Sequence, residues 1–530
     1  MRERPLGPDR AGLPHGLLSD PDSIARDVKT VLFVGAGRHQ RRAILRAREL
    51  GLRVVGVDRN PDALGLQGAD VAEAVDFTDV DAVTEVARRH SVDGVLTVSA
   101  DRAVPIVAAV AERLGLPGIG TETAHLMTHK IAMRRTLADA GVSQPRFAGA
   151  RDMASARSAL DAVGVPAVLK PADSGGQRGI FYVESRDELD GHVHAALAES
   201  PTDEAIVESF HDGLELNGIV IARGGEAFPL TLSDRLRPPG IGFGVGWIHV
   251  YPASIYADVL AEAERVAVHA VHALGLRDGI AFPQLIVGDD GSVRVVEVAA
   301  RIPGGQMADL VRHAVGVDLV EVALRNALGE EVTDELVLPK FKQPLAIRFL
   351  TAKPGPLPTG KVRSIGPLDP VLAAEGVVQA DTYLQVGETI RPVRLDGDRR
   401  GYVIATADTS VEALQRAEAA ARLLEVEVEG EPAPARVRLE RLWAQHEAAG
   451  FPALGDVDLT ADLAEYDGFV AGRVQTALRS SSRTTGSVGE AEDDLSARVR
   501  ATGDPGATAY IDRLDELNEL VRSLDEEAAR

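Results

Sequence analysis

Residues 168–180 of this chain read VLKPADSGGQRGI. The apolar start predicts a short buried strand that ends at Lys170, and a second strand begins at Phe181 after a loop with three glycines. Glycine lets backbone N–H groups crowd around a polyanion, and a lysine at the loop's edge adds a mobile positive charge. The stretch therefore indicates a flexible loop that closes over nucleotide phosphates. A hairpin whose glycines serve only the turn is an alternative that this stretch alone leaves open.

The composition of the chain limits its class and its partners. A length of 530 residues exceeds what one hydrophobic core fills, so about three or four domains are expected. An apolar fraction of 45% with 26% charged residues is ordinary for a globular protein. The formal net charge of −23 disfavours nucleic acid and anionic membranes as main partners, because both attract a basic surface.

Two residue types are scarce enough to be informative. Cysteine is absent from the sequence, which excludes disulfides, thiolate metal sites and cysteine nucleophiles. Only seven of the 57 basic residues are lysines, and Lys130 and Lys170 are the two that lie in apolar sequence. No apolar run reaches the roughly 18 residues of a spanning helix, and residues 1–27 lack the pattern of a signal peptide. We therefore expect a cytoplasmic location and no membrane partner.

The N-terminal part of the chain alternates strands with helices. Residues 1–27 are rich in proline and glycine and are expected to form a disordered lead-in. The expected strands after it cover residues 31–34, 53–57 and 94–98, and the expected helices cover 40–50, a segment ending at 89, and 103–114. Strands that are apolar on both faces indicate a parallel sheet covered by helices. This part is therefore expected to be a small doubly wound domain.

A glycine-rich turn follows the first of these strands. Gly35 and Gly37 match the first two glycines of a dinucleotide-binding turn, and Asp58 stands where a ribose-binding acid would end the second strand. Gln40 occupies the place of the third glycine, so helix and strand cannot approach as closely there. A dinucleotide-dependent oxidoreductase is thus an alternative to a structural turn that faces another ligand.

The central part alternates helices with antiparallel strands. Lys130 begins the second of two short helices expected within residues 121–141. Helices over residues 153–163 and 186–198 flank the opening stretch, and a strand over 205–208 follows them. The glycine loop thus lies between two expected helices.

A hairpin and an irregular loop come next. Strands over residues 213–222 and 227–233 are joined by two glycines, which predicts an antiparallel pair. Residues 233–252 combine several glycines with aromatic residues of the kind that are usually buried, so we expect a mobile substrate lid. The candidates for substrate contact in this lid are Arg235, Trp247 and His249.

A polar cluster ends the following hairpin. Residues 280–287 and 292–298 predict two antiparallel strands, and alternation puts Glu297, Ala299 and Arg301 on one face. A carboxylate and a guanidinium that converge at a strand end predict a metal on the acid and phosphate oxygens on the arginine. A structural ion pair between the two is the alternative.

The C-terminal part separates into two compositions. Residues 345–428 predict a β-rich module with one helix at about 411–424. The composition of residues 431–530 predicts acidic helical segments interrupted by a linker at 480–489, and the last predicted helix has a narrow apolar stripe. We expect this tail to pack as a helical appendage or as an oligomer contact.

Taken together, the spaced motifs between residues 30 and 430 resemble the ATP-grasp superfamily. The resemblance implies a multidomain chain with α/β and α+β parts. The implied parts are the lead-in (1–27), a Rossmann-like pre-ATP-grasp domain (28–120), an ATP-grasp domain (121–335) whose lid subdomain covers about 145–212, a β-rich C-terminal module (340–430) and an acidic helical tail (431–530).

In this family two lysines and a glycine-rich loop bind the phosphates of ATP, and a hinge binds the adenosine. The hinge pattern, acidic-x-aromatic-x-x-Gly-x-Glu, runs here from Glu208 to Glu215. The resemblance implies that Glu208 faces the adenine amino group, that backbone at Ser209 and His211 lines the ring, and that Glu215 holds the ribose. The implied ATP-binding residues are Lys130, Lys170, Ser174, Gly175, Gly176, Gly179, Glu208, Ser209, Phe210, His211 and Glu215.

The metal site of the family is only partly present. Its ligands for Mg²⁺ are acidic at the positions of Gln284 and Glu297, with a frequent third amide ligand where Ala299 stands. A glutamine oxygen coordinates Mg²⁺ more weakly than a carboxylate, and alanine cannot coordinate it. The resemblance thus implies ATP with Mg²⁺ on Gln284 and Glu297, and it leaves the number of magnesium ions open.

A subgroup of the family is more similar still. The motif from Glu297 to Gly305, the segment 238–252 and the module at 345–430 resemble carboxylate–amine ligases that join amino acids, the L-amino-acid ligases. This implies small-molecule carboxylate and amine substrates and an amide or peptide bond formed through an acyl phosphate. The residues implied in catalysis are Arg301, Lys170 and Arg178. The residues implied in substrate contact are Arg235, Trp247, His249, Gly304 and Gly305.

Two other functions fit the same motifs. One is an ATP-grasp ligase that acts on a carboxylate other than an amino acid. The other is a regulatory protein that binds ATP without turnover, which the substitutions at Gln284 and Ala299 make conceivable. Many members of the family are homodimers, so the resemblance admits a homodimer here and leaves the oligomeric state open.

Overall fold

The computed structural model describes residues 28–176, 178–237 and 245–429. The expected lead-in, the acidic tail and the glycines at positions 240, 242 and 244 of the expected lid lie outside these residues. The chain divides into two compact units. Unit 1 comprises residues 1–234 and 251–342, and unit 2 comprises residues 235–250 and 343–530. No helix in the described ranges is both long and apolar enough to cross a membrane.

Unit 1 begins with a parallel sheet, as expected. Its strands are β1 (Thr30–Val34), β2 (Arg53–Asp58), β3 (Val71–Ala74) and β4 (Gly94–Leu96), in the order β3-β2-β1-β4. Helix α1 (Arg41–Glu49) connects β1 with β2, a short 3₁₀ turn at Leu66–Gly68 lies between β2 and β3, and α2 (Val80–Arg89) connects β3 with β4. A second 3₁₀ turn at Asp101–Ala103 and helix α3 (Val104–Leu114) follow β4. The sequence prediction missed β3 because its four residues, VAEA, contain a single β-branched side chain.

The turn after β1 is held by Asp58, the last residue of β2. The carboxylate of Asp58 accepts hydrogen bonds from the backbone N–H groups of Ala36 and Asn60, both at 3.0 Å. The side chain of Gln40 donates to the carbonyl of Val98 at 2.6 Å. Asp58 therefore stabilises the turn, which is the structural role that was weighed against dinucleotide binding.

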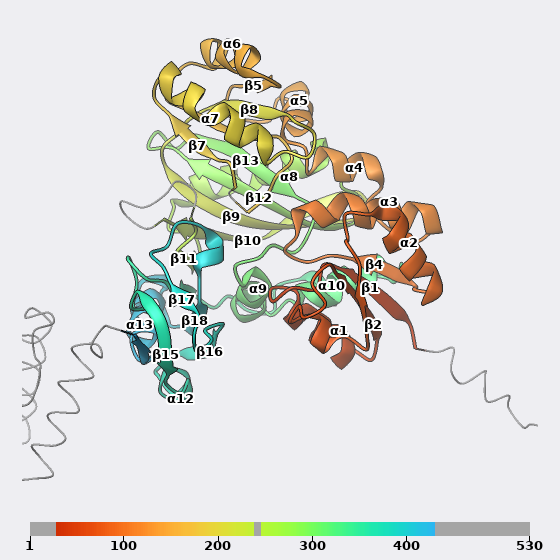
Figure 1. Ribbon diagram of the computed structural model, residues 1–530, viewed down its shortest axis with the longest axis vertical. Helices are drawn as coiled ribbons and strands as arrows, with labels where there is room; N and C mark the ends of the chain where they lie inside the picture. Colours follow the sequence, from red (N-terminus) through yellow and green to blue (C-terminus); the bar gives the residue numbers. More distant parts are fainter. Residues whose placement is uncertain (1–27, 177, 238–244, 430–530) are drawn as a thin grey trace, which may run out of the picture. The chain divides into compact units, whose positions relative to one another are not determined.

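The glycine loop belongs to a second, antiparallel sheet. Strands β5 (Phe147–Ala150), β8 (Ala205–Ser209), β6 (Ala167–Pro171) and β7 (Phe181–Val183) follow in that spatial order, and α6 (Met153–Val163) and α7 (Arg186–Ala198) pack against them. We call residues 147–209 the lid subdomain; Figure 1 shows its two helices lying together over the sheet. Asp152 and Ser155 form a capping box that fixes the start of α6.

The third sheet of unit 1 supports the rest of the candidate site. Its antiparallel strands are β13 (Val293–Ala299), β12 (Gly279–Val287), β9 (Leu214–Arg223) and β10 (Glu226–Leu236). Helix α8 (Ala257–Ala273) covers one face, where Leu216, Leu285 and Val298 share its core. The remaining helices of unit 1 are α4 (Thr121–Leu126), α5 (Lys130–Asp139), α9 (Met307–Val315), α10 (Leu319–Ala327) and α11 (Asp334–Val337).

Unit 2 contains the β-rich module. Strands β14 (Leu345–Phe349), β18 (Gly401–Thr406) and β16 (Val377–Thr382) pair antiparallel, and β15 (Gly360–Ile365) pairs with β17 (Thr389–Ile390) and β19 (Val426–Val428). Helix α13 (Ser410–Ala421) supplies Ala413 and Ala417 to the core, and α12 (Asp369–Leu372) is short. The helix expected at about 411–424 is therefore present and ends slightly earlier.

The prediction of an irregular lid over residues 233–252 was wrong at both ends. Strand β10 continues to Leu236, and β11 (Ile248–Tyr251) resumes regular structure before the expected end of the loop. Ser233 and Asp234 are polar but buried within the strand, where Asp234 accepts a hydrogen bond from the N–H of Ser254 at 3.0 Å. A buried carboxylate that has a hydrogen-bond partner is thus compatible with a strand where the sequence suggests a loop.

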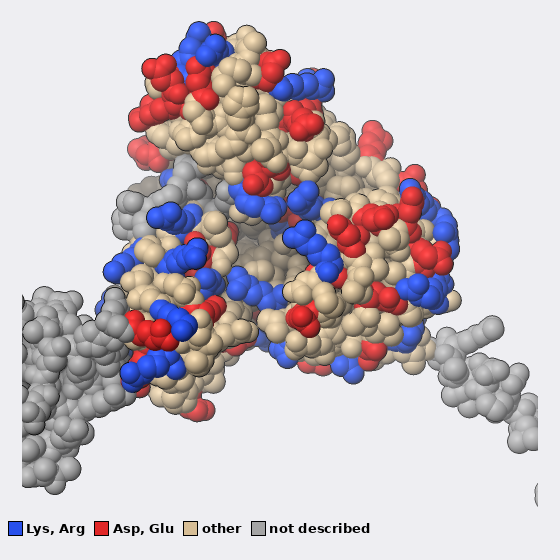
Figure 2. Space-filling view, in the orientation of Figure 1, with Lys and Arg blue, Asp and Glu red and all other residues tan. Residues whose placement is uncertain are grey.

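Charged side chains of both signs cover the outer surface of unit 1. On the face that Figure 2 shows, acidic and basic groups alternate over the lid subdomain and over the N-terminal domain. The described residues on that face therefore do not form one continuous acidic field.

Candidate active site

The glycine loop is anchored at its base by the first candidate lysine. Lys130 starts α5 and is 5% exposed, and its Nζ donates to the carbonyl of Ser174 at 2.8 Å. The Oγ of Ser174 is buried and has no hydrogen-bond partner among the described residues. Gly176 and Gly179 have φ of 70° and 67°, a conformation that strains any other residue. Lys130 therefore fixes the backbone at the start of the loop, where the Ser174 hydroxyl has no hydrogen-bond partner among the described residues.

The second candidate lysine lies in a buried ion-pair network. Nζ of Lys170 is 2.6 Å from Oε2 of Glu208, and Nε of Arg134 is 2.7 Å from Oε1. All three side chains are almost fully buried. Burial alone would raise the pKa of Glu208, but the charges and hydrogen bonds of Arg134 and Lys170 lower it to about 2. Burial lowers the pKa of Lys170, and the charge of Glu208 opposes that shift.

This network corrects the role expected for Glu208. The resemblance implies that its carboxylate faces the adenine amino group, whereas the structure places both carboxylate oxygens on buried cations. Sequence reasoning missed Arg134. A signal was available, because Arg134 lies four residues after Lys130 and so shares one face of α5.

The rest of the hinge lies close together. The N–H of Ser209 donates to the carbonyl of Arg146 at 2.9 Å, and its hydroxyl lies 2.9 Å from Nε2 of His211. The Phe210 ring meets Tyr182 edge to face at 4.9 Å. Glu215 follows on β9, opposite Ile286 of β12. The backbone N–H of Ser209 is thus already hydrogen-bonded within the protein, so it is not the group that the hinge would offer to a ligand.

The two predicted metal ligands are direct neighbours. Gln284 on β12 pairs with Glu297 on β13, so both side chains lie on the same face of the sheet. A β-bulge makes this possible: Leu285 pairs with Val295, which leaves Val296 as an extra residue in β13. Within the described ranges, no group of three or more His, Asp or Glu residues could hold a metal. A metal here would depend on amide oxygens as well as on the carboxylate.

Arg134 also contacts this bulge. Its guanidinium donates to the carbonyls of Val295 at 2.8 Å and Val296 at 2.6 Å, in addition to its bond with Glu208. One buried side chain therefore connects strand β8 of the lid subdomain with the strand that carries Glu297.

The acid that pairs with Arg301 comes from the N-terminal domain. Nε and Nη2 of Arg301 lie 2.7 and 2.5 Å from Oδ1 of Asp101, so the alternative of a Glu297–Arg301 ion pair was wrong about the partner. The third nitrogen, Nη1, is buried and has no hydrogen-bond partner in the described parts of the chain. The β-bridge between Val98 and Ile302 brings the two segments together. The pairing of Asp101 with Arg301 was not predicted because the two residues lie far apart in the sequence.

Asp101 also contacts the glycine loop. A Cβ added at Gly175 would lie 2.6 Å from Oδ2 of Asp101, so only glycine fits at this position without movement. Arg178 is exposed, and its Nε lies 3.8 Å from Glu199. A Cβ added at Gly304 would lie 3.6 Å from the side chain of Ser99, and Gly305 has φ of 66°. Of these two glycines, Gly305 has the backbone conformation that favours glycine.

The three substrate candidates of the expected lid belong to unit 2 and pack inside it. Trp247 donates from Nε1 to Thr351 at 3.1 Å, and Arg348 lies 4.3 Å above its ring. His249 meets Phe349 edge to face at 5.2 Å. Burial, followed by the charges of Arg399 and Arg235, lowers the pKa of His249 well below its ordinary value. These residues therefore form a packed interior, which corrects the expectation of a mobile lid.

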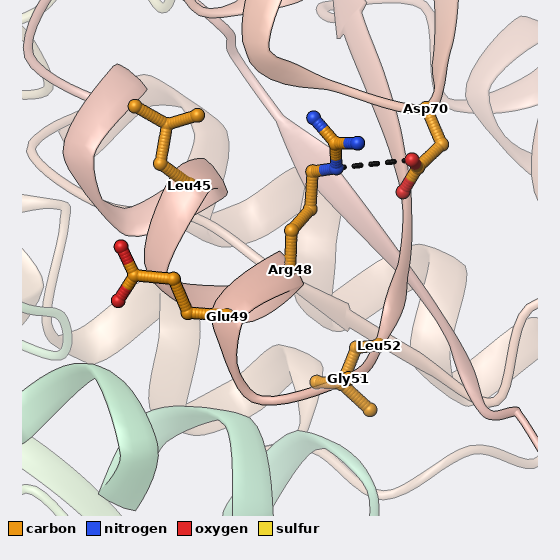
Figure 3. Close-up of a pocket in the computed structure, with 6 residues that line it drawn as sticks. All are labelled: Leu45, Arg48, Glu49, Gly51, Leu52 and Asp70. Atoms are coloured by element: carbon orange, nitrogen blue, oxygen red, sulfur yellow. Dashed lines mark ion pairs between the residues drawn. The ribbon is translucent and has the colours of Figure 1, made fainter.

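A pocket elsewhere in unit 1 contains none of the predicted residues. It has a volume of about 490 Å³ and is lined by Leu45, Arg48, Glu49, Gly51, Leu52 and Asp70. Figure 3 shows the 3.0 Å ion pair between Arg48 and Asp70 at its side. Apolar carbons and one satisfied ion pair offer no group for phosphate chemistry, so we do not assign this pocket a role in catalysis.

Comparison with known proteins identifies the parts of the chain. Residues 45–118 match the ATP-grasp N-terminal domain, and residues 129–335 match the ATP-binding domain of the carbamoyl-phosphate synthase L chain. Residues 348–429 match the L-amino acid ligase C-terminal domain 2. The three matches follow in the order in which the sequence analysis placed these parts.

Individual relatives agree with these matches. The formate-dependent phosphoribosylglycinamide formyltransferase of Ignicoccus hospitalis is 28% identical over 410 residues, covering 74% of this chain and 95% of that protein. The crystal structure of L-amino acid ligase from Bacillus licheniformis superposes with a TM-score of 0.65 at 21% identity, covering 76% of this chain and 99% of that one.

A further solved structure bears on the cofactor. The biotin carboxylase domain dimer of the 2-oxoglutarate carboxylase of Hydrogenobacter thermophilus, solved with MgADP, ADP and bicarbonate, has a TM-score of 0.61 at 19% identity, covering 75% of this chain and 90% of that one. The match of residues 129–335 to an ATP-binding domain agrees with the expectation of ATP, whereas Mg²⁺ stays a prediction for this chain. The chain belongs to the ATP-grasp superfamily, whose ADP-forming ligases join carboxylates to amines.

Proposed function

We propose that this enzyme uses ATP to join two amino acids, releasing ADP and phosphate. The observation that carries the choice of amino acids is the match of residues 348–429 to an L-amino acid ligase C-terminal domain. The likeness of the fold to the Bacillus licheniformis L-amino acid ligase supports it.

The chemistry follows from the poor leaving group of a carboxylate. The γ-phosphoryl group of ATP passes to a carboxylate oxygen of the first amino acid, which gives an acyl phosphate and ADP. The amine of the second amino acid attacks the acyl carbon, the C–N bond forms, and the C–O bond to phosphate breaks. The amine loses its proton, and inorganic phosphate leaves. The protein's task is mostly to position charges and neutralise them.

The side chains that lack partners fit this task. The Ser174 hydroxyl and Nη1 of Arg301 are buried donors without a partner among the described residues, and anionic oxygens would satisfy both. We assign Lys130 and Lys170 to the α- and β-phosphates, and the loop with Arg178 to the transferring group. Arg301 would hold the acyl phosphate and the oxyanion that develops on it, and Asp101 would orient Arg301.

The oxygen donors on β12 and β13 fit a divalent cation. Glu297 and Gln284 are cross-strand neighbours and offer one carboxylate and one amide oxygen. Mg²⁺ held by these two residues would neutralise phosphate charge. Glu215 is assigned to the ribose, and the hinge at Ser209 and His211 to the adenine.

A panel of amino-acid pairs incubated with ATP tests the proposal. We expect phosphate release that depends on both amino acids and a product whose mass equals the pair less one water. A second candidate is a ligase for another carboxylate, which the formyltransferase of Ignicoccus hospitalis favours. Phosphate release with formate and an aminated sugar phosphate, but with no amino-acid pair, would select it. Nucleotide binding without phosphate release for any acid would instead select the regulatory alternative.

The subunit arrangement is a separate proposal. The Hydrogenobacter thermophilus domain is described as a dimer, and we propose a homodimer for this chain as well. Light scattering of the purified full chain would give about twice the 56.1 kDa chain mass.

A further inference from the structure

The hydrogen-bonded ladder between β6 and β8 ends just before the glycine loop. Pro171 of β6 pairs with Ala205 of β8, and this is the last pair of the two strands. One further backbone bond follows, from the N–H of Ala172 to the carbonyl of Glu204 at 2.9 Å. The carbonyl of Ala172 accepts from the N–H of Lys130 at 2.7 Å. Beyond Pro171, the path of the chain into the loop is therefore set by helix α5 and by the segment before β8.

A short turn before β8 fixes the next residue of the loop. The hydroxyl of Ser200 donates to Oδ1 of Asp173 at 2.6 Å and accepts from the N–H of Glu204 at 3.1 Å. Ser200 is only 6% exposed, so these bonds are shielded from water. Asp173 precedes Ser174, whose buried hydroxyl has no hydrogen-bond partner in the described ranges. The turn therefore holds the chain one residue before a proposed phosphate donor.

The side chain of Glu204 extends from the same turn to the start of α5. Its Oε2 lies 2.8 Å from Nε2 of His129, and its Oε1 accepts from Nε of Arg151 at 2.7 Å. Burial alone would raise the pKa of Glu204, but the hydrogen bonds from Arg151 and His129 lower it. Glu204 is therefore a carboxylate at neutral pH and can only accept hydrogen bonds.

The other ring nitrogen of His129 fixes the position of its proton. Nδ1 accepts from the N–H of Ala132 at 3.3 Å and so caps the start of α5, which requires that Nδ1 carries no proton. The proton of the neutral ring is then on Nε2, where Glu204 accepts it. Without Glu204 nothing in this pattern holds the proton on Nε2, and the cap beside Lys130 is weakened.

These bonds form a closed circuit through three segments of the chain. The circuit runs from α5 through Ala172 and Asp173 to the turn before β8. From Ser200 and Glu204 of that turn it returns to α5 at His129. We call these five residues the loop anchor. We propose that the loop anchor positions the first candidate lysine and the start of the glycine loop for the phosphates of the nucleotide.

The groups that the loop anchor holds are all assigned to phosphates. Nζ of Lys130 donates to the carbonyl of Ser174 at 2.8 Å, so the lysine and the loop are held together. None of the bonds described above involves a residue assigned to the adenine or the ribose. The loop anchor should therefore act on binding of the phosphates and leave binding of the nucleoside unchanged. The inference rests on the proposed nucleotide site, but it does not depend on which acid and amine are joined.

Calorimetry of the full chain with ADP and with adenosine tests the inference without turnover. Glu204→Ala is expected to weaken ADP binding about tenfold or more, the effect of losing one hydrogen bond to a charged group. Adenosine lacks phosphates, so its affinity is expected to equal that of the wild type. Glu204→Gln still offers an oxygen to Nε2 of His129, and we expect it to bind ADP nearly as tightly as the wild type does.

Two further variants separate positioning of the loop from capping of a helix. His129→Asn keeps a capping oxygen for α5 but is too short to reach Glu204, so ADP binding is expected to weaken as in Glu204→Ala. Ser185 caps α7 in the same lid subdomain, where its hydroxyl accepts from the N–H of Glu188. Ser185→Ala, the matched control, loses a helix cap and is expected to bind ADP as the wild type does.

The outcomes separate this inference from the proposed function. Unchanged ADP affinity in Glu204→Ala, or in His129→Asn should the alanine variant not fold, overturns the role of the loop anchor alone. Equal losses of affinity for ADP and adenosine would show a general defect of the site and overturn that role as well. A wild-type chain that binds ADP no more tightly than adenosine would instead overturn the assignment of the loop to phosphates, and with it the proposed nucleotide site.

Discussion

Glu208 carries the negative charge that two buried cations share. Glu208→Gln leaves Lys170 and Arg134 without an acid, and breaking a buried ion pair costs roughly 3–5 kcal/mol. We expect urea denaturation to show a loss of that order in the free energy of unfolding. Glu262→Gln breaks a surface pair with Arg265 and serves as the control, with an expected loss below about 1 kcal/mol.

The same carboxylate predicts sensitivity to acid. The pKa of Glu208 falls from its ordinary 4.5 to about 2 in the folded chain, so the unfolded chain binds its proton more tightly. The stabilisation is complete above pH 4.5 and is lost as the pH falls from 4.5 toward 2. Unfolding free energies measured across this range fall more steeply for the wild type than for Glu208→Gln. Parallel curves for the two proteins would contradict the assignment.

Arg301 and Asp101 predict a separation between turnover and nucleotide binding. Arg301→Met is expected to abolish most phosphate release while ADP affinity, measured by calorimetry, stays near the wild-type value. Asp101→Asn removes charge from an Arg301 contact worth about 1.5–3 kcal/mol, so we expect roughly a tenfold loss of turnover. Equal losses of ADP affinity and turnover would show that the pair acts on nucleotide binding.

At the scale of elements, the bulge in β13 decides where Glu297 points. Arg134 caps the Val295 and Val296 carbonyls, and Arg134→Met leaves them without that donor. We expect the Mg²⁺ concentration for half-maximal phosphate release to rise about tenfold or more, as for residues that orient metal ligands. Arg134→Lys keeps the positive charge beside Glu208, but a lysine cannot donate to both carbonyls. Compared with Arg134→Met, we therefore expect it to regain most of the free energy of unfolding but little of the Mg²⁺ affinity.

The neighbouring residue offers a matched control. Arg135 follows Arg134 on α5 and is exposed, so Arg135→Met changes the same charge without touching the bulge. Its Mg²⁺ response is expected to equal that of the wild type. A rise in both variants would trace the effect to net charge.

Element positions were predictable where the pattern is local. The apolar spacing and caps around α6 and α7 predict both helices at their observed bounds, and the glycines predict the loop between β6 and β7. The bulge was not predictable, because strand register depends on pairing between strands and not on the local pattern.

The pairing of Asp101 with Arg301 was not predictable either, because 200 residues separate them and a local pattern carries no information on such a contact. The prediction of an irregular lid was wrong because the buried Asp234 has a hydrogen-bond partner, the N–H of Ser254, and so is tolerated in a strand that polar composition disfavours.

At the scale of the whole molecule, unit 2 is assembled from two separate stretches of chain. Residues 235–250 belong to it together with residues after 342, and Trp247, Ile248 and Val250 pack against the later segment. A chain ending at Lys342 therefore exposes an apolar strand. We expect it to aggregate or to unfold at a much lower temperature than a chain ending at Glu429, in which the later part of that core is present. Equal melting temperatures for the two truncations would contradict this division.

The order of the domains was predictable from the sequence, since each is marked by a motif of its own. The division into units was not, because it depends on which later strands the segment 235–250 joins.

Because unit 2 is built from two separate stretches of chain, the first stretch must wait during synthesis for the second. During synthesis, Ile248 and Val250 leave the ribosome roughly one hundred residues before Ala346, which shares their core. At about 5–20 residues per second, the segment stays uncovered for roughly 5–20 s. Throughout that interval a strand carrying Trp247 is available to chaperones and to neighbouring nascent chains. Slower translation through residues 251–345 therefore lengthens the time for which this segment lacks its partners.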